Sequence, residues 1–140
     1  THTRLWQSAF GEAASVFNDD KPALRRLESG WFAYGTPWCG KDGINKNEKW
    51  PLAGICFLKK AERNRIRRLT PEEALPLLLG QTTFRLTPNN MSLLLTHVDC
   101  LLREVPVYEL ENTPTESAAR LSYETMRPDK PQTGESHEAE

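Results

Sequence analysis

Long apolar runs, paired cysteines and a large net charge are all absent from this sequence. No apolar stretch approaches the roughly 18 residues that a membrane span needs, and no signal-peptide pattern is visible. The 140 residues include three cysteines, an odd number, which argues against a disulfide framework and for a reducing compartment. A formal charge of −1 gives no general attraction to nucleic acid or to an anionic membrane. We therefore expect a cytoplasmic protein whose partners are neither nucleic acid nor membrane.

The spacing of histidine and cysteine gives little support for a zinc or thiol site. His97 and Cys100 are three residues apart on a segment with helical periodicity, so they can share a face, and Cys39 or Cys56 could join them. However, no Cys-x-x-Cys or His-x-x-x-His spacing is present. The pattern favours small buried cysteines and a surface histidine. Cys39, close to Lys41 in a loop, is the thiol that we expect to be most reactive.

Two adjacent carboxylates follow a short apolar run near the N-terminus. The run, Ala14 to Phe17, has the small, β-branched and aromatic residues of a buried strand, and Asp19 and Asp20 stand just beyond it. Open α/β sheets place their ligand chemistry at such strand ends. In phosphoryl-transfer sites an aspartate there holds Mg²⁺ or accepts a proton from the attacking hydroxyl. Asp-Asp-Lys-Pro is also ordinary turn chemistry, so both interpretations stay open on these residues alone.

The rest of the N-terminal half predicts a helix, a hairpin and a long loop. Apolar residues at helical spacing predict a helix over 5–10, which Gly11 would end. Two short apolar segments, 23–27 and 31–34, flank Glu28-Ser29-Gly30 and predict a β-hairpin. Residues 35–50 then lack any periodicity, and a loop of this length in a compact domain is usually functional or disordered.

Within that loop, Trp38, Lys41 and Asn45 are the best candidates for contact with a substrate or nucleotide. Lys41, together with Lys21, could supply positive charge to a transferring phosphoryl group. The alternative is a solvated loop in which Trp38 packs against the core.

The basic residues concentrate on a second expected hairpin. Leu52 to Leu58 predicts one strand, and Asn64 to Leu69 predicts a returning strand. Six basic side chains lie on or between these strands: Lys59, Lys60, Arg63, Arg65, Arg67 and Arg68. They could bind phosphate groups or an acidic protein. Alternating polar side chains on the outer face of a hairpin explain them as well.

Capping signals divide the C-terminal half into helices. Thr70-Pro71-Glu72-Glu73 and Thr113-Pro114-Thr115-Glu116 each combine an N-cap threonine, proline at the first helical position and glutamate at the third. Helical spacing over 91–103 predicts a helix with a core-facing stripe. The stripe consists of Leu94, Leu95, Val98, Leu101 and Leu102. We expect a strand over 105–110, a last helix over 117–126 and a disordered polar tail over 127–140.

Four segments in order carry a resemblance to a known family. They are Thr-His-Thr-Arg-Leu-Trp at 1–6, Asn-Asp-Asp-Lys-Pro-Ala-Leu at 18–24, Gly-Thr-Pro-Trp-Cys-Gly-Lys-Asp-Gly-Ile-Asn at 35–45 and Pro-Leu-Ala-Gly-Ile-Cys-Phe-Leu at 51–58. Together they resemble the C-terminal two-thirds of bacterial kinases related to HPr kinase/phosphorylase, within the phosphoenolpyruvate-carboxykinase-like group of P-loop proteins. The resemblance runs from Thr1 to about Met126, and its most specific parts are the second segment and Gly-Thr-Pro-Trp.

The resemblance implies an α/β domain over 1–126, with a mixed β-sheet, hairpins and C-terminal helices. It implies an ATP-dependent phosphotransferase that uses Mg²⁺ and transfers phosphate to a hydroxyl acceptor, either a protein or a small molecule. In such folds the helix that begins this chain starts at the phosphates, so its N-terminal dipole favours the anion. Relatives of this kind are often multimeric, so a homo-oligomer is a possible state.

The resemblance also implies residue roles. Asp19 and Asp20 would share the roles of general base and Mg²⁺ ligand, and two coupled carboxylates leave open which does which. The cofactor-binding residues would be Thr1, Thr3 and Lys41. The substrate-binding residues would be Gly35, Thr36, Trp38 and Asn45.

One part of the family pattern is missing. In the family, Thr-His-Thr-x-Leu-Trp directly follows the phosphate loop Gly-x-x-x-x-Gly-Lys-Ser, which this sequence does not contain. We therefore expect a partial kinase domain that is inactive as this chain. The alternative is a non-catalytic module of the same fold that binds a protein or peptide through the basic hairpin and the Trp38 loop.

Overall fold

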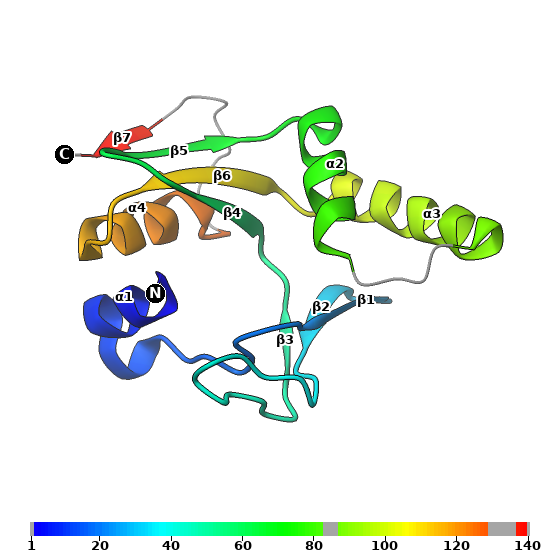
Figure 1. Cartoon of the computed structure of the whole chain (residues 1–140), viewed down its shortest axis with the longest axis horizontal. Helices are drawn as coiled ribbons and strands as arrows, with labels where there is room; N and C mark the ends of the chain where they lie inside the picture. Colours follow the sequence, from blue (N-terminus) through cyan, green and yellow to red (C-terminus); the bar gives the residue numbers. More distant parts are fainter. Residues whose placement is uncertain (1, 83–86, 129–136, 140) are drawn as a thin grey trace.

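The computed structural model describes residues 2–82 and 87–128, and the backbone of 137–139. The chain forms a mixed α/β fold with two sheets and flanking helices, so the predicted α/β class is confirmed at this level (Figure 1). The elements in chain order are α1 (His2–Phe10), the 3₁₀ turn η1 (Gly11–Ala13), β1 (Ala23–Leu27), β2 (Gly30–Tyr34), β3 (Lys49–Pro51), β4 (Ile55–Lys60), β5 (Asn64–Arg68), α2 (Pro71–Gln81), α3 (Pro88–Glu104), β6 (Val107–Asn112), α4 (Glu116–Met126) and β7 (His137–Ala139).

The first sheet contains the hairpin that the sequence predicts. β1 and β2 are antiparallel, with Leu27 opposite Gly30, and β3 adds to the other side of β2. Gly30 has a backbone φ of +126°, which residues with a Cβ rarely adopt. This explains why a glycine ends the turn. Trp31 and Ala33 are buried on the face of this sheet that meets α3.

The first sheet is held to α3 by one carboxylate. Glu104, at the end of α3, accepts two hydrogen bonds from the Arg26 guanidinium (2.7 and 2.9 Å) and a third from the Trp31 indole N–H (2.8 Å). Beneath this contact Trp31 packs with Leu101 and Val105 in a small core cluster.

The second sheet has the order β4-β6-β5-β7, so the predicted hairpin between the strands at 52–58 and 64–69 is wrong. Figure 1 shows β6 lying between β4 and β5. β6 runs parallel to β4, with Ile55 opposite Val107, and antiparallel to β5, with Ile66 opposite Leu110. β6 contributes three buried apolar residues, and the central position gives it backbone partners on both sides.

Two helical layers cover one face of this second sheet. Ile66 and Leu110 are fully buried, and the half-buried Leu121 and Met126 of α4 pack against them. α1 lies on the far side of α4, where the rings of Trp6, Phe10 and Tyr123 are in mutual contact (Figure 1).

The two predicted capping boxes have different outcomes. At α2 the box is confirmed: the Thr70 hydroxyl accepts from the Glu73 N–H (3.3 Å), and the Glu73 carboxylate accepts from the Thr70 N–H (3.2 Å). At Thr113 the prediction is wrong, since α4 begins two residues beyond the expected first helical position. The buried Asn64 side chain explains the shift, because its Oδ1 accepts from both the backbone N–H (2.7 Å) and the hydroxyl (3.0 Å) of Thr113.

Helix α3 is longer than predicted, and its apolar stripe is confirmed in part. Leu94, Val98 and Leu101 are buried, whereas Leu95 is 41% exposed and does not belong to the core. The expected strand at 105–110 lies two residues later, as β6.

Two further predictions concern the ends of the chain. The strand expected over 14–17 is wrong: the chain bends at Ala14 and at Phe17, and the neighbouring Asn18 makes only an isolated bridge with Asn45. The tail expected to be disordered over 127–140 falls mostly on residues outside the described part, 129–136 and 140. Within it, β7 pairs antiparallel with β5.

Candidate functional site

The carboxylate of Asp19 binds the backbone of the long loop between β2 and β3. Its Oδ1 accepts hydrogen bonds from the N–H groups of Gly40 (2.8 Å) and Ile44 (3.2 Å), and its Oδ2 accepts from the N–H of Asp42 (2.9 Å). These bonds, that of Gly40 above all, hold the pKa of the Asp19 carboxyl below its usual value. Asp19 therefore fixes the backbone of this loop through hydrogen bonds.

The neighbouring Asn18 holds the first part of the same loop. Its Nδ2 donates to the carbonyl oxygens of Thr36 (3.2 Å) and Trp38 (3.0 Å), and its Oδ1 accepts from the N–H of Asp20 (3.0 Å). The backbone of the two segments also pairs, because the Lys46 N–H donates to the Phe17 carbonyl (2.8 Å). Asn18 and Asp19 together thus order the loop over residues 36–46.

Two glycines are required by this close packing. A Cβ on Gly35 would lie 1.8 Å from the carbonyl oxygen of Lys46, and a Cβ on Gly40 would lie 2.9 Å from that of Asp19. A side chain at Gly40 would push the loop away from Asp19, and one at Gly35 would push the two ends of the loop apart.

A cavity of about 410 Å³ lies between the first turn of α1 and this loop. Among the described residues, its lining consists of Thr3, Arg4, Asp19, Lys41 and Asp42. Arg4 forms an ion pair with Asp42, which ties α1 to the loop. The Asp19 carboxylate already accepts three backbone N–H groups, and Lys41 has no ion-pair partner among the described residues. Two cations and two carboxylates line the cavity, and both carboxylates are already bound, Asp42 by Arg4 and Asp19 by backbone N–H groups. Lys41 and the N-terminal end of α1 are therefore the groups available to an anion.

Helix α1 is fixed in place by α4. The Trp6 indole N–H donates to the Ser122 hydroxyl (3.1 Å), and His2, which also contacts that indole, is half-buried, so desolvation lowers its pKa. Arg120 lies over the Phe10 ring and donates to the Ala9 carbonyl. These contacts fix the helix from which Thr3 lines the cavity.

The structure brings together three of the predicted site residues, since Thr3, Asp19 and Lys41 all line the cavity. Arg4 and Asp42 also line it but were not predicted; each directly follows a predicted residue, Thr3 and Lys41, which is the one signal that could have found them. Thr1 lies outside the described residues.

The remaining predicted residues lie around the loop rather than in the cavity lining. Asp20 is exposed, with no hydrogen bond or ion pair to its carboxylate among the described residues. Gly35 and Thr36 begin the loop, where the Thr36 hydroxyl donates to the Lys21 carbonyl (2.6 Å). Asn45 donates to the Pro37 carbonyl (3.1 Å). Trp38 is 65% exposed, so the alternative in which it packs against the core is wrong.

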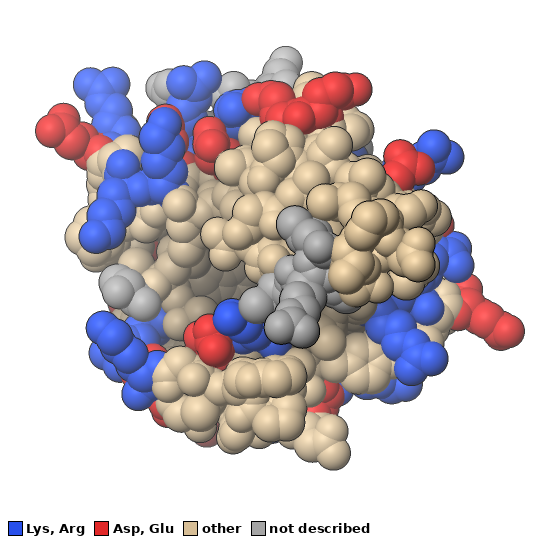
Figure 2. Space-filling model, turned by 45° about the vertical axis from the view of Figure 1, so that its right-hand side comes forward, with Lys and Arg blue, Asp and Glu red and all other residues tan. Residues whose placement is uncertain are grey.

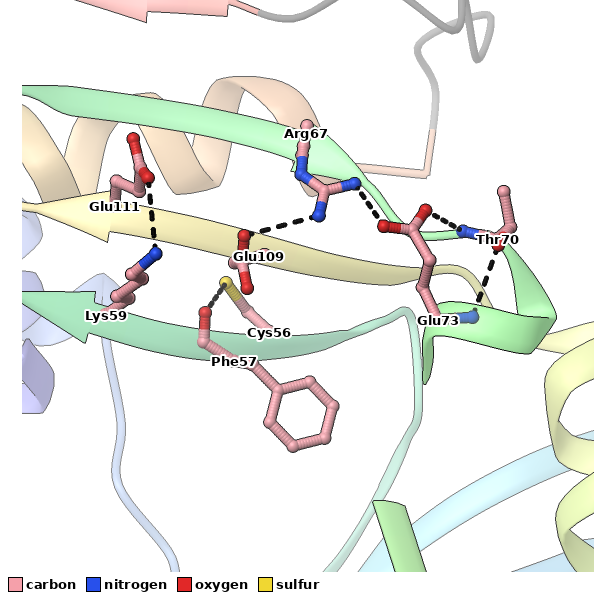
Figure 3. Close-up of polar contacts among 8 residues, drawn as sticks. All are labelled: Cys56, Phe57, Lys59, Arg67, Thr70, Glu73, Glu109 and Glu111. Atoms are coloured by element: carbon pink, nitrogen blue, oxygen red, sulfur yellow. Dashed lines mark hydrogen bonds and ion pairs between the residues drawn. The ribbon is translucent and has the colours of Figure 1, made fainter. Parts of the chain in front are cut away.

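The basic residues of β4 and β5 are partly neutralised by glutamates. Arg67 contacts Glu109 of β6 (3.5 Å) and Glu73 of α2 (2.7 Å), and Lys59 contacts Glu111 of β6 (3.8 Å) (Figure 3). Figure 2 shows positive and negative side chains mainly around the edge of the visible face, whose centre consists largely of uncharged residues. Lys59, Arg65 and Arg67 share one face of the second sheet with Glu109 and Glu111. Lys60 and Arg68 alternate to the other face, and Arg63 lies in the connection between β4 and β5.

Within residues 2–82 and 87–128, no three His, Cys, Asp or Glu side chains form a group that could hold a metal ion. The three cysteines are free; Cys39 is exposed, and burial raises the pKa of the Cys56 thiol to about 12. In the same part of the chain, none of the helices combines the length and apolar character required to cross a membrane.

Comparisons of the chain with models of protein families, with curated proteins and with solved structures gave no match in any of the three.

Proposed function

We propose that this chain forms the C-terminal part of an ATP-dependent phosphotransferase related to HPr kinase and to the phosphoenolpyruvate-carboxykinase-like P-loop proteins. The intact protein would transfer a phosphoryl group to a hydroxyl acceptor. One observation carries the proposal: Thr3, Asp19 and Lys41, up to 38 residues apart in the sequence, line one cavity at the positive end of α1. The family resemblance implies site roles for these three residues.

The charges of the cavity fit a phosphate group. Lys41 would contact phosphate oxygens, and the Thr3 hydroxyl and the N-terminal end of α1 would donate hydrogen bonds to them. Arg4 is kept at the cavity wall by Asp42. Preorganised donors of this kind stabilise charge that develops in a transferring phosphoryl group.

The residues fit ATP better than they fit Mg²⁺. When bound, Mg²⁺ would neutralise charge on the phosphates. Asp20, whose carboxylate makes no contact among the described residues, is the better metal ligand or proton acceptor of the acidic pair. Asp19 has less capacity for either role, because both of its oxygens already accept backbone hydrogen bonds. Asp20 would accept the proton of the acceptor hydroxyl.

The coding DNA upstream of the Thr1 codon tests this proposal. We expect an in-frame extension that encodes an apolar strand followed by Gly-x-x-x-x-Gly-Lys-Ser directly before Thr1. A stop codon or an initiation codon immediately before Thr1 would contradict the catalytic proposal. With the extension present, the longer protein should hydrolyse or transfer the γ-phosphate of ATP, and Lys41→Met should reduce that rate.

The non-catalytic alternative retains one supporting observation, the exposure of Trp38 and Trp50. Its second basis, a basic hairpin, is not formed, because β6 separates β4 from β5. If the upstream sequence contradicts the kinase proposal, peptide binding that is lost in Trp38→Ala would support this alternative.

A further inference from the structure

We propose that Asp19 is a positioning residue that binds the backbone on both sides of Lys41 and thereby holds the Lys41 side chain in the cavity beside Thr3. The ligand-binding part of this inference rests on the proposed function, whereas the positioning part depends only on the contacts of Asp19. The sequence predicted a different role, in which Asp19 acts with Asp20 as base and metal ligand.

Asp19 binds the backbone immediately before and immediately after Lys41. Asp19 Oδ1 accepts from the N–H of Gly40 (2.8 Å), and Oδ2 accepts from the N–H of Asp42 (2.9 Å), so the residues directly before and after Lys41 are both fixed to one carboxylate. The bond from Ile44 (3.2 Å) adds a third point further along the loop. With the backbone held on either side, the Cα–Cβ direction of Lys41 is fixed, so its side chain starts beside the cavity that it lines.

Two other features serve the same arrangement. Gly40 allows the loop to approach Asp19, since a Cβ there would lie 2.9 Å from the Asp19 carbonyl oxygen and 3.1 Å from Oδ2. On the opposite side, the ion pair between Arg4 and Asp42 fixes the residue after Lys41 to the first turn of α1. The backbone around Lys41 is therefore held between α1 and Asp19.

The same contacts make Asp19 a poor general base. Three N–H donors favour the ionised carboxylate and keep its pKa below the usual value, so it holds a transferred proton weakly. Asp20 has no such donors to its carboxylate among the described residues. The two neighbouring aspartates would thus divide the work: one holds the loop, and the other is available for chemistry.

The first experiment is nuclear magnetic resonance of the ¹⁵N-labelled full chain, with Asp19→Asn compared with the matched change Asp20→Asn. We expect Asp19→Asn to shift the amide signals of Gly40, Asp42 and Ile44, because an amide side chain cannot accept from all three N–H groups. Asp20→Asn should leave these three signals in place. If they respond to Asp20→Asn, or do not respond to Asp19→Asn, the inference is wrong.

Acidification of the wild-type chain gives an independent readout. Because the pKa of Asp19 is lowered on folding, the hydrogen bonds are complete above the ordinary carboxyl value of 3.8 and are lost as the pH falls through the lower folded value. The three amide signals should therefore move together, with one shared midpoint below 3.8. Separate midpoints would show that no single carboxylate joins these residues.

The second experiment separates positioning from direct contact. Mg²⁺·ADP is titrated calorimetrically into the wild-type chain, Asp19→Asn, Lys41→Met and the double variant. We expect each single substitution to weaken binding by about tenfold or more, because Lys41→Met removes the charged contact and Asp19→Asn releases the backbone that positions it. The double variant should bind no more weakly than Lys41→Met, because Asp19 acts through Lys41.

The outcomes distinguish the two proposals. Additive losses in the double variant would contradict positioning through Lys41, since they would mean that Asp19 affects the ligand independently. Absence of Mg²⁺·ADP binding by the wild-type chain would count against the proposed nucleotide site in this chain, and the amide signals would still decide the role of Asp19.

Discussion

The loop from Gly35 to Lys46 and the second sheet are each stabilised by a different kind of contact. The loop from Gly35 to Lys46 is ordered mainly by two adjacent side chains, Asn18 and Asp19, which bind backbone groups along it. The second sheet is ordered by backbone ladders on both sides of β6 and by a core in which Ile66 and Leu110 are fully buried. Order that depends on few contacts is lost locally, whereas order spread over a core is lost only with the whole fold.

The largest expected effect comes from the core of the sheet. Leu110→Ala removes a fully buried side chain from the central strand and leaves a cavity against Ile66 and α4. We expect a loss of about 3 kcal/mol in the free energy of unfolding, measured by urea denaturation, with one transition for the sheet and helices. An unchanged unfolding midpoint would mean that β6 is not central to the core.

A smaller effect is expected at the buried polar residue of the same region. Asn64→Ala leaves the Thr113 N–H without its acceptor and removes the contact of Asn64 with the Ser117 hydroxyl (2.9 Å). We expect a loss of about 2 kcal/mol, because a buried donor is left unsatisfied. Asn112→Ala, on a half-buried neighbour, is the matched control and should cost less.

The loop should respond to a single methyl group without unfolding the sheet. Gly35→Ala places a Cβ 1.8 Å from the Lys46 carbonyl oxygen, which the backbone cannot accommodate without moving. We expect the amide signals of 36–46 to shift while those of β4, β5 and β6 stay unchanged. Gly80→Ala, where nothing lies within 4 Å of the added Cβ, serves as the control. Shifts that extend into β6 would contradict the independence of the two regions.

The smallest effect is expected on the charged face of the sheet. Lys59 and Glu111 are 3.8 Å apart, and the lysine side chain is 65% exposed. Lys59→Ala should change the free energy of unfolding by about 0–1 kcal/mol, less still at high salt. A loss comparable with that of Leu110→Ala would mean that the ion pairs of this face, not its core, stabilise the sheet.

The sequence predicted features that depend on neighbours along the chain. The β1–β2 hairpin follows from Glu28-Ser29-Gly30, and the α2 cap follows from Thr70 and Glu73, three residues apart. The position of β6 was not predictable, because adjacent apolar strands favour a hairpin and nothing local shows that a strand some 40 residues later separates them. The prediction of a helix cap at Thr113 was wrong for the same reason. The N–H and hydroxyl of Thr113 donate to Asn64, which is distant in the sequence.

The residues of the candidate site also divide into those that the sequence predicted and those that it did not. Thr3, Asp19 and Lys41 came from segments that resemble a family, not from periodicity, and the fold places them around one cavity. Arg4 and Asp42 could not be paired from the sequence, because their contact exists only once α1 has packed on α4 and the loop has bound Asp19. The hydrogen bonds of Asp19 to the residues before and after Lys41 could not be predicted either. Nearly every residue type has a backbone N–H, so the sequence does not show which ones a carboxylate binds.

The insertion of β6 between β4 and β5 has a consequence for how the chain reaches this fold. β4 and β5 are joined by three residues but share no ladder with each other, so their pairing waits for a strand that begins 39 residues after β5 ends. Contacts of such sequence separation carry a loop-closure cost and slow the folding reaction. During synthesis both strands leave the ribosome before β6 does, with open edges that can pair wrongly. The arrival of β6 is therefore the natural candidate for the rate-limiting event in folding.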